Sequence, residues 1–334
     1  MDIFIQQLIN GATLGTVYAV VALGYTMVYG IIQLINFAHG EVVMIGAMVA
    51  YTVIVTLTAA GSTMPPLAIV LIAALAAIPV CMAVGFTLER VAYRPLRRAP
   101  RLAPLITAIG LSIILQHLAM IIWSRNPLPY PQIVQTVSYN ITGNEGGATI
   151  TNVQIAIIGI SVAMMAALIA LVYRTKLGIA MRATAQNQQV AGLMGIDINR
   201  VIAITFVIGA ALGAVAGVMV GSYYGIAHYQ MGFLLGLKAF SAAVLGGIGN
   251  LAGAMLGGLL LGIIEALGAG YVGDLTNLCH FASWSDALAK RCEVDGSVVL
   301  FGSNYQDVFA FLVLILVLVF RPSGLLGERV SERA

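Results

Sequence analysis

Long apolar runs dominate this chain of 334 residues. A helix needs roughly 20 consecutive apolar residues to cross the hydrocarbon core of a bilayer, which is about 30 Å thick. Charged residues or turn signals bound nine such runs, which are residues 8–31, 41–60, 67–88, 102–123, 153–173, 201–223, 237–249, 251–271 and 306–320. The sequence therefore predicts an all-α, polytopic membrane bundle of about eight to nine helices, built as one domain over residues 1–334.

The composition excludes a soluble domain. Sixty per cent of the residues are hydrophobic and 9% are charged, whereas soluble domains carry about 25% charged residues. Too little polar surface remains to cover a globule of this size, so membrane lipid is an expected partner. Nucleic acid is not expected, because the basic residues are few and mostly flank apolar spans.

The positions of the basic residues predict an orientation. Arginine and lysine gather in short cytoplasmic loops, and 12 of the 16 basic residues follow the third, fifth and ninth spans. With nine crossings all three segments share one side, which places the N-terminus outside and the C-terminus in the cytoplasm. These residues are Arg90, Arg94, Arg97, Arg98, Arg101, Arg174, Lys176, Arg182, Arg200, Arg321, Arg329 and Arg333.

Two features interrupt the regular pattern of spans. The seventh run, 237–249, is short and ends in Gly246-Gly247-Ile248-Gly249-Asn250, which favours a half-helix over a complete crossing. The segment 272–305 is predicted to be a periplasmic loop that contains Cys279 and Cys292. An outer location permits a disulfide between these cysteines, and two free thiols are the alternative.

Glycines recur every four residues in three spans. Such spacing places them on one helix face, where backbones approach closely. Internal packing of the bundle is the simpler interpretation, and a subunit interface is the alternative. The glycines are Gly11 and Gly15 in the first span, Gly209, Gly213, Gly217 and Gly221 in the sixth, and Gly253, Gly257, Gly258 and Gly262 in the eighth.

Charged residues inside spans are rare and mark functional sites by default. Lys238 opens the seventh span and Glu265 lies in the eighth. If the chain turns near Gly249-Asn250, the two side chains return to the same half of the membrane, and we expect them to pair. In the alternative, Lys238 extends its ammonium to the membrane surface.

A polar break, Asn36-Phe37-Ala38-His39-Gly40-Glu41, separates the first two spans. Irregular polar backbone at membrane depth is tolerated only where protein buries it or where it lines a cavity. The residues Asn36, His39 and Glu41 are therefore candidates to border a translocation path, together with Lys238 and Glu265. A cytoplasmic turn with a capping role is the alternative.

The segment 174–200 is the most informative polar stretch. Residues Ala180–Met194 can form one helix with small residues among polar ones, and Gly195 suits a helix stop. A compact, weakly charged helix between two spans fits a docking site for a partner. An inert amphipathic surface helix is the alternative.

The sequence contains no phosphate-binding GxxxxGK[ST] loop, so the chain is not a P-loop ATPase. No His, Cys and carboxylate spacing resembles a metal site, and no nucleophile–base motif of the GxSxG type occurs. We therefore expect a protein without a cofactor, a bound metal or an enzymatic centre of its own.

Four blocks of the sequence resemble one family. They are Gly15–Gly24 leading to Ile35–Glu41, Gly178–Ala183 with Asn187 and Gly195-Ile196, Gly236–Phe240 with Leu245–Gly249, and Phe320–Gly327. With them, the chain resembles the permease subunits of ABC importers for branched-chain amino acids, specifically the H-type (LivH-like) subunit. The blocks extend over nearly the whole chain.

The resemblance implies a multi-subunit importer in the bacterial inner membrane. A second permease subunit would complete the pore, two ATPase subunits would bind inside, and a periplasmic binding protein would deliver a neutral amino acid. The segment 174–200 then resembles a coupling helix that fits an ATPase groove. Its candidate residues are Gly178, Arg182, Ala183, Asn187 and Gly195. ATP binding would drive alternating access between the two sides.

Other functions stay open at this point. Relatives in the same superfamily are associated with urea, short amides and other amino acids, so the substrate is not determined by the permease sequence. A self-sufficient ion-coupled transporter is a second class, with Glu41 and Glu265 as its coupling residues. Dependence of transport on ATPase subunits distinguishes these classes.

Overall fold

A computed structural model describes residues 2–61, 63–97, 99–100, 102–143, 147–275 and 305–327. Cys279, Cys292 and most of the predicted loop 272–305 lie outside the described residues, so the disulfide stays a prediction. Within the described part, Cys81 is a free, buried cysteine. The fold is a helical bundle with two short two-stranded sheets.

Seven of the described helices are long and apolar enough to cross a membrane. Each matches a predicted span, with ends that differ by a few residues. They are α1 (Asp2–Ile32), α2 (His39–Ala59), α3 (Pro66–Thr87) continued by η1 (Leu88–Tyr93) and α4 (Arg94–Leu96), α5 (Leu102–Ile122), α6 (Asn152–Arg174), α9 (Ile198–Tyr224) and α11 (Leu251–Leu275). The prediction of a polytopic helical membrane bundle is confirmed.

Two further apolar helices are shorter, α10 (Met231–Gly246) and α13 (Gln306–Phe320). At 1.5 Å per residue, the 16 residues of α10 extend about 24 Å. The bounds predicted for this short element, 237–249, are shifted, since α10 begins six residues earlier and ends at Gly246, and its length falls short of the hydrocarbon core of about 30 Å. Positive φ angles at Gly247 and Gly249 end the helix there.

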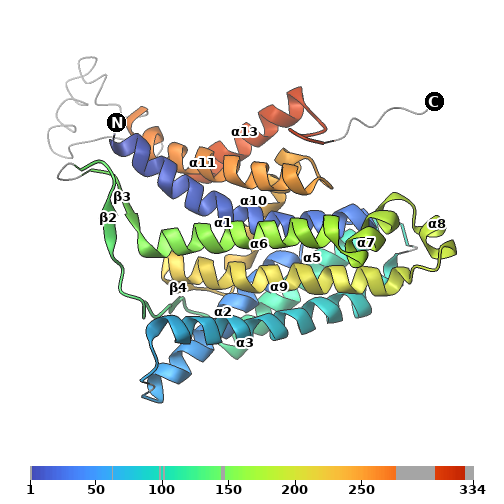
Figure 1. Cartoon of the computed structure of the whole chain (residues 1–334), viewed down its shortest axis with the longest axis horizontal. Helices are drawn as coiled ribbons and strands as arrows, with labels where there is room; N and C mark the ends of the chain where they lie inside the picture. Colours follow the sequence, from blue (N-terminus) through green and yellow to red (C-terminus); the bar gives the residue numbers. More distant parts are fainter. Residues whose placement is uncertain are drawn as a thin grey trace.

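The four short strands lie in the connections between helices. β1 (Leu128–Pro129) pairs with β4 (Ile226–Ala227), and β2 (Ser138–Asn140) pairs with β3 (Thr149–Thr151), both antiparallel. Figure 1 shows the N-terminus and the β2–β3 hairpin at one end of the bundle, which we call the N-terminal end. The helices α7 (Lys176–Gln186) and α8 (Gln188–Leu193) lie at the opposite end, the α8 end.

Helix α1 occupies the centre of the bundle, with 83% of its most apolar window buried. It packs against α11 through glycines, because a Cβ at Gly11 or Gly15 would lie 2.7 or 2.8 Å from a backbone Cα of α11. Gly209, Gly213 and Gly217 of α9 likewise face α1 and α2. The repeated glycines thus serve packing within this chain, as the simpler interpretation predicted.

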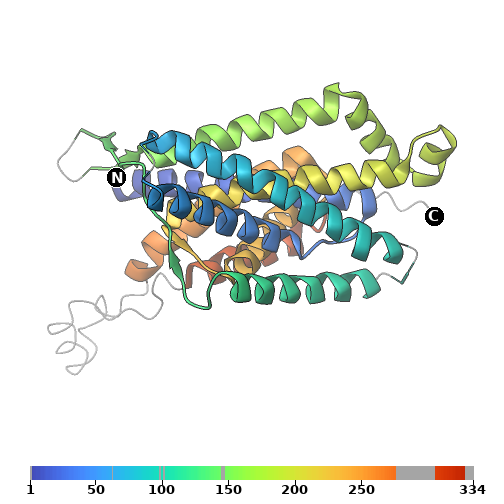
Figure 2. The same cartoon turned by 90° about the horizontal axis from the view of Figure 1, so that it is seen from below.

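The outer layer consists of α3, α5 and α6. Their most apolar windows are only 17–28% buried, and Figure 2 shows α5 and α6 on opposite flanks of the bundle. Their exposed side chains are mainly Ile, Leu and Val. Such faces suit lipid or another membrane helix.

Candidate functional site

The polar break between α1 and α2 lies inside the bundle. Helix α2 begins at His39, whose ring lies against Gly24 and contacts the Tyr25 ring edge-on at 4.9 Å. Since Gly24 is eight residues before the end of α1, α2 begins about 12 Å inside that end. Within the irregular residues 33–38, Asn36 and Ala38 are buried, whereas Gln33 is exposed and lines a cleft, which fits irregular backbone that protein buries or that borders a cavity.

Glu41 is a fully buried carboxylate in this break. Its Oε1 accepts hydrogen bonds from Ser112 Oγ and Gln116 Nε2 of α5, both at 2.8 Å. Its Oε2 has no described hydrogen-bond partner, whereas the Tyr25 hydroxyl and the His39 ring interact with the backbone of Gly40 and Val21. Buried polar atoms without partners are rare and call for an explanation such as water, an ion or function.

Glu41 Oε2 and Tyr25 Oη lie against the first turns of α10, whereas the His39 ring lies between α1 and α9. A Cβ at Gly232 would lie 2.6 Å from Glu41 Oε2, and a Cβ at Gly236 would lie 2.9 Å from Tyr25 Oη. Two glycines of α10 therefore let this helix approach the polar atoms of α1 and α2 without intervening side chains. The sequence singled out His39 and Glu41, but it offered no signal for Tyr25.

Lys238 and Glu265 form the expected pair, with Nζ 2.7 Å from Oε1. The lysine side chain is only 11% exposed, so it does not extend to the membrane surface. Its Nζ also lies 2.7 Å from Asp307 Oδ1 of α13, a partner that sequence reasoning missed. Tyr18 Oη of α1 donates a hydrogen bond to Glu265 Oε1 at 3.3 Å. The network therefore joins α1, α10, α11 and α13.

The C-terminal segment 322–327, which we call the C-terminal strap, lies across the turn between α10 and α11. Leu325 and Leu326 donate backbone hydrogen bonds to the carbonyls of Leu245 and Gly246 at 2.9 and 3.0 Å. Asn250 Nδ2 donates to the Leu326 carbonyl at 2.8 Å. Two blocks far apart in the sequence, at 245–250 and 320–327, are therefore one structural unit.

Asn250→Ala should loosen this strap. The change removes the bond to Leu326 and the bond that Asn250 Oδ1 accepts from the Gly253 amide at 3.2 Å. Loss of such a helix-capping side chain costs about 1 kcal/mol. We expect faster hydrogen–deuterium exchange of the Leu325 and Leu326 amides, whose hydrogen bonds hold the strap, and Gln188→Ala, at the same end, as a control without this effect. An unchanged exchange rate would show that Asn250 does not hold the strap.

The predicted single helix 180–194 is two helices. α7 ends at Gln186, and Asn187 has extended backbone while its Oδ1 accepts hydrogen bonds from the amides of Gln189 and Val190, both at 3.0 Å. An asparagine side chain caps the second helix in this way because it satisfies free amides of the first turn. Gly195, with φ +86°, ends α8 as predicted.

The other coupling candidates have different positions. Gly178 lies against the backbone of Val172, with no room for a Cβ, and Ala183 is half-buried in α7. Arg182 is exposed and its guanidinium lies 5.2 Å from the centre of the Tyr173 ring. Gly178 and Ala183 therefore pack against the bundle, whereas Arg182 faces solvent.

The exposed tip of this segment is apolar, and sequence reasoning missed it. The exposed fractions of Val190, Leu193 and Met194 are 52%, 85% and 79%. Exposed large apolar residues grouped at one place mark interaction sites. We call these three residues the α8 tip. They were hidden in a segment whose average composition is polar.

A cleft of about 720 Å³ opens beside α7. It lies between the ends of α1 and α6, the α10–α11 turn and the C-terminal strap, and both Arg182 and Asn250 line it. Methionine, isoleucine and valine side chains form much of its wall. The cleft can accept a small molecule with an apolar part and an anionic or polar part.

Comparison of the sequence with known proteins identifies the family of this chain. Residues 7–318 match the family described as branched-chain amino acid transport system / permease component. The chain is 45% identical over 330 residues to the high-affinity branched-chain amino acid transport system permease protein BraD of Pseudomonas aeruginosa, with 99% of this chain and 98% of BraD covered.

Further relatives extend the comparison. The chain is 42% identical over 332 residues to the permease protein LivH of the same kind of system in Escherichia coli K12, covering 99% of this chain and 97% of LivH. It is 30% identical over 164 residues to the autoinducer 2 import system permease protein LsrC of Escherichia coli O9:H4, covering 48% of this chain. No solved structure matches the chain. The chain therefore belongs to the family of branched-chain amino acid transport system permease components.

Proposed function

We propose that this chain is the membrane-spanning permease subunit of an ATP-binding-cassette importer that moves branched-chain amino acids across a bacterial inner membrane. The observation that carries the proposal is its near-complete match to BraD and LivH, both named as permeases of high-affinity branched-chain amino acid transport. The seven membrane-spanning-capable helices agree with that role. ATP hydrolysis takes place on partner subunits, since the chain has no phosphate-binding loop.

The α8 end faces the cytoplasm in this proposal. The basic segments that begin at Arg90, Arg174 and Arg321 converge there, which fits the bias of cytoplasmic loops for arginine and lysine. The contact between Arg97 and Asn199 and the shared cleft of Arg182 and Pro322 support this convergence. The N-terminal end then meets a periplasmic binding protein, and a second permease subunit completes the pore.

The translocation path follows α10. Tyr25 Oη and Glu41 Oε2 lie on one side of this helix, against Gly236 and Gly232, and Lys238 with Glu265 lies on another. Polar groups inside a membrane bundle mark substrate pathways, and a zwitterion needs such groups for both of its charges. The cleft beside Arg182 is the inner end of the path, where an aliphatic side chain and a carboxylate both find complementary groups.

Co-purification of partner subunits and uptake into membrane vesicles together test the proposal. A tagged chain purified in mild detergent should bring along two ATPases and a second permease, and the complex should import leucine only with ATP and a binding protein. Recovery of a folded chain alone, with uptake driven by an ion gradient, would instead support a self-sufficient transporter. Glu41 and Glu265 would then be the first residues to substitute.

Substrate choice is tested by competition. Leucine, isoleucine and valine should compete with one another for uptake, whereas urea and short amides should not. The half-length similarity to the autoinducer 2 import system permease LsrC makes autoinducer 2 a further competitor to include. Competition by these compounds but not by leucine would assign the chain to another branch of importers.

Leu193→Asp with Met194→Asp should detach the ATPases. The α8 tip exposes both side chains, and apolar anchors of this kind dominate interfaces. We expect the ATPase affinity to fall at least about tenfold, which corresponds to about 1.4 kcal/mol. Co-purification from detergent measures it. Gln189→Asp, an exposed polar residue of the same segment, is the matched control, and an equal loss with it would point to charge alone.

A further inference from the structure

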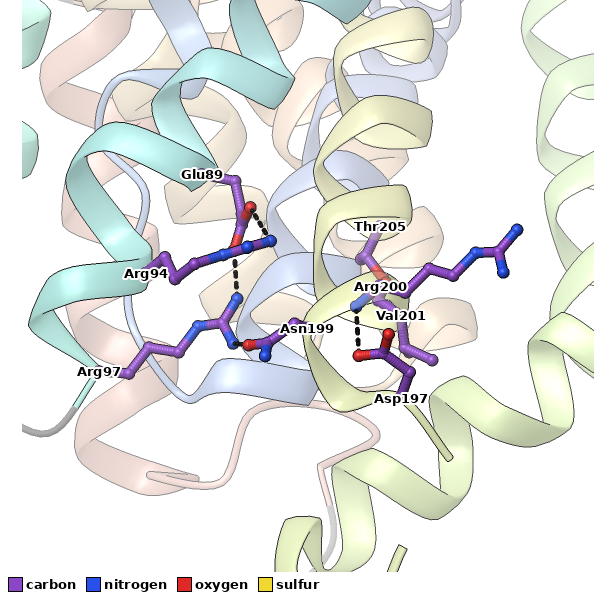
Figure 3. Close-up of polar contacts among 8 residues, drawn as sticks. All are labelled: Glu89, Arg94, Arg97, Asp197, Asn199, Arg200, Val201 and Thr205. Atoms are coloured by element: carbon purple, nitrogen blue, oxygen red, sulfur yellow. Dashed lines mark hydrogen bonds and ion pairs between the residues drawn. The ribbon is translucent and has the colours of Figure 1, made fainter. Parts of the chain in front are cut away.

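An ion cluster around the buried carboxylate of Glu89 joins the end of the third span to the start of α9, as Figure 3 shows. Glu89 of η1 is fully buried and accepts hydrogen bonds from Arg94 Nε at 3.2 Å and Nη2 at 3.1 Å. Arg97 binds the same carboxylate through Nη2. A carboxylate held by two guanidiniums in this way is geometrically well defined, because arginine presents its donors in a rigid fork.

Arg97 also reaches across to α9. Its Nη1 donates to Asn199 Oδ1 at 2.7 Å. Asn199 lies in the first turn of α9, just after Asp197, whose side chain caps the helix by accepting from the Arg200 amide at 3.1 Å. This turn directly follows α8, so a displacement of the α8 tip reaches Asn199 through only a few residues.

The other end of the cluster leads to the polar break. Tyr93, in the same π-helical turn as Glu89, donates a hydrogen bond from Oη to Asn36 Oδ1 at 2.9 Å. Its ring also packs against Phe206 of α9, with centroids 5.1 Å apart. Asn36 belongs to the break that positions His39 and Glu41. Both Tyr93 and Asn36 are buried, so each depends on the other to satisfy a polar group.

The element that joins these contacts is itself unusual. Residues Leu88–Tyr93 form a π-helix, a geometry that is rare and frequently occurs at functional sites. The wider turn carries Glu89 and Tyr93, four residues apart, toward different partners. Burial lowers the pKa of the Arg97 guanidinium, and the nearby Glu89 carboxylate opposes that shift.

We infer that the segment from η1 to Arg97, residues 88–97, is the mechanical link between the ATPase-docking segment and the translocation path, with Arg97 and Tyr93 as its two positioning residues. A movement of α8 displaces the start of α9, and the hydrogen bond between Arg97 and Asn199 transmits this displacement to Arg97. The hydrogen bond between Tyr93 and Asn36 then transmits it to the polar break. Coupling of this kind needs a contiguous set of contacts with two arrangements. The inference rests on the proposed function.

Asn199→Ala removes the hydrogen bond that Arg97 makes to α9, and Tyr93→Phe removes the hydrogen bond to Asn36. Asn199 is exposed and the phenylalanine keeps the ring contact with Phe206, so both variants should fold. We expect each to lower the amount of leucine imported per ATP hydrolysed about fivefold, while ATP hydrolysis continues. Arg200→Ala is the matched control, because its guanidinium leaves the same turn of α9 away from the cluster (Figure 3).

The double variant gives the decisive result. If both contacts belong to one link, Asn199→Ala with Tyr93→Phe should lower the transport ratio no further than the stronger single variant, because the link is already broken. Additive losses, a parallel fall in hydrolysis and import, or an equal effect of Arg200→Ala would overturn the inference. A wild-type complex without ATP-dependent import would instead refute the proposed function.

Discussion

Lys238→Met should be among the most damaging single substitutions in this chain. The change leaves Glu265, which is 1% exposed, without a cation, and it also removes the partner of Asp307. Removal of one member of a buried ion pair costs about 3–5 kcal/mol, because the other charge stays buried and unpaired. We expect a marked fall in the melting temperature of the detergent-solubilised protein and a loss of uptake.

Matched variants separate charge from size in this network. Lys238→Arg keeps the charge and should retain most of the stability. Asp307→Asn should cost only about 0–1 kcal/mol, because its side chain is 35% exposed and solvent screens it. Replacing both Lys238 and Glu265 by Met should recover much of the loss, since an apolar pair of similar volume is often neutral. A double variant worse than Lys238→Met would contradict the pairing.

Gly15→Val should prevent α1 from packing against α11. A Cβ at this position would lie 2.8 Å from both Cα and the carbonyl oxygen of Leu259, and a backbone cannot move aside as a side chain can. Overpacking of a tight core costs about 3 kcal/mol or more when nothing can yield. We expect most of the variant to elute as aggregate in size-exclusion chromatography after solubilisation.

Gly159→Val is the control for this prediction. Gly159 lies in α6, is exposed, and has nothing within 4 Å of the position of a Cβ. The same substitution there should leave the elution profile and the melting temperature close to those of the wild type. Similar damage at both positions would mean that valine itself, rather than the close approach of α1 and α11, destabilises the helices.

The spans were predictable because each depends on local composition alone. A run of about 20 apolar residues must be helical in a bilayer to satisfy its own backbone, wherever its neighbours lie. The start of α10 was predicted six residues too late for the same reason. Composition locates an apolar stretch, but the first turn at Met231 is set by the approach of Gly232 and Gly236 to α1 and α2.

Among the candidate site residues, the contact that the sequence predicted correctly was one for which charge was the signal, whereas the place of these residues on a translocation path stays a proposal. Lys238, Glu265 and Glu41 stood out as ionisable residues in apolar segments, and the pairing of the first two is present. Glu89 looked like part of an ordinary basic loop, although it is fully buried. The break at Asn187 was also missed, because an asparagine between two polar stretches is compatible with a continuous helix until its side chain is seen to cap the next turn.

The sequence by itself determined that this chain is a membrane bundle, where its apolar segments lie, and which family it resembles. Bilayer thickness and backbone hydrogen bonding act on each segment separately, so those properties are local. Only the tertiary structure decided which polar groups meet: Lys238 with Asp307, Arg97 with Asn199, and Tyr93 with Asn36. These contacts join residues from 57 to 102 positions apart, and they depend on how packed helices cross, which no local pattern encodes.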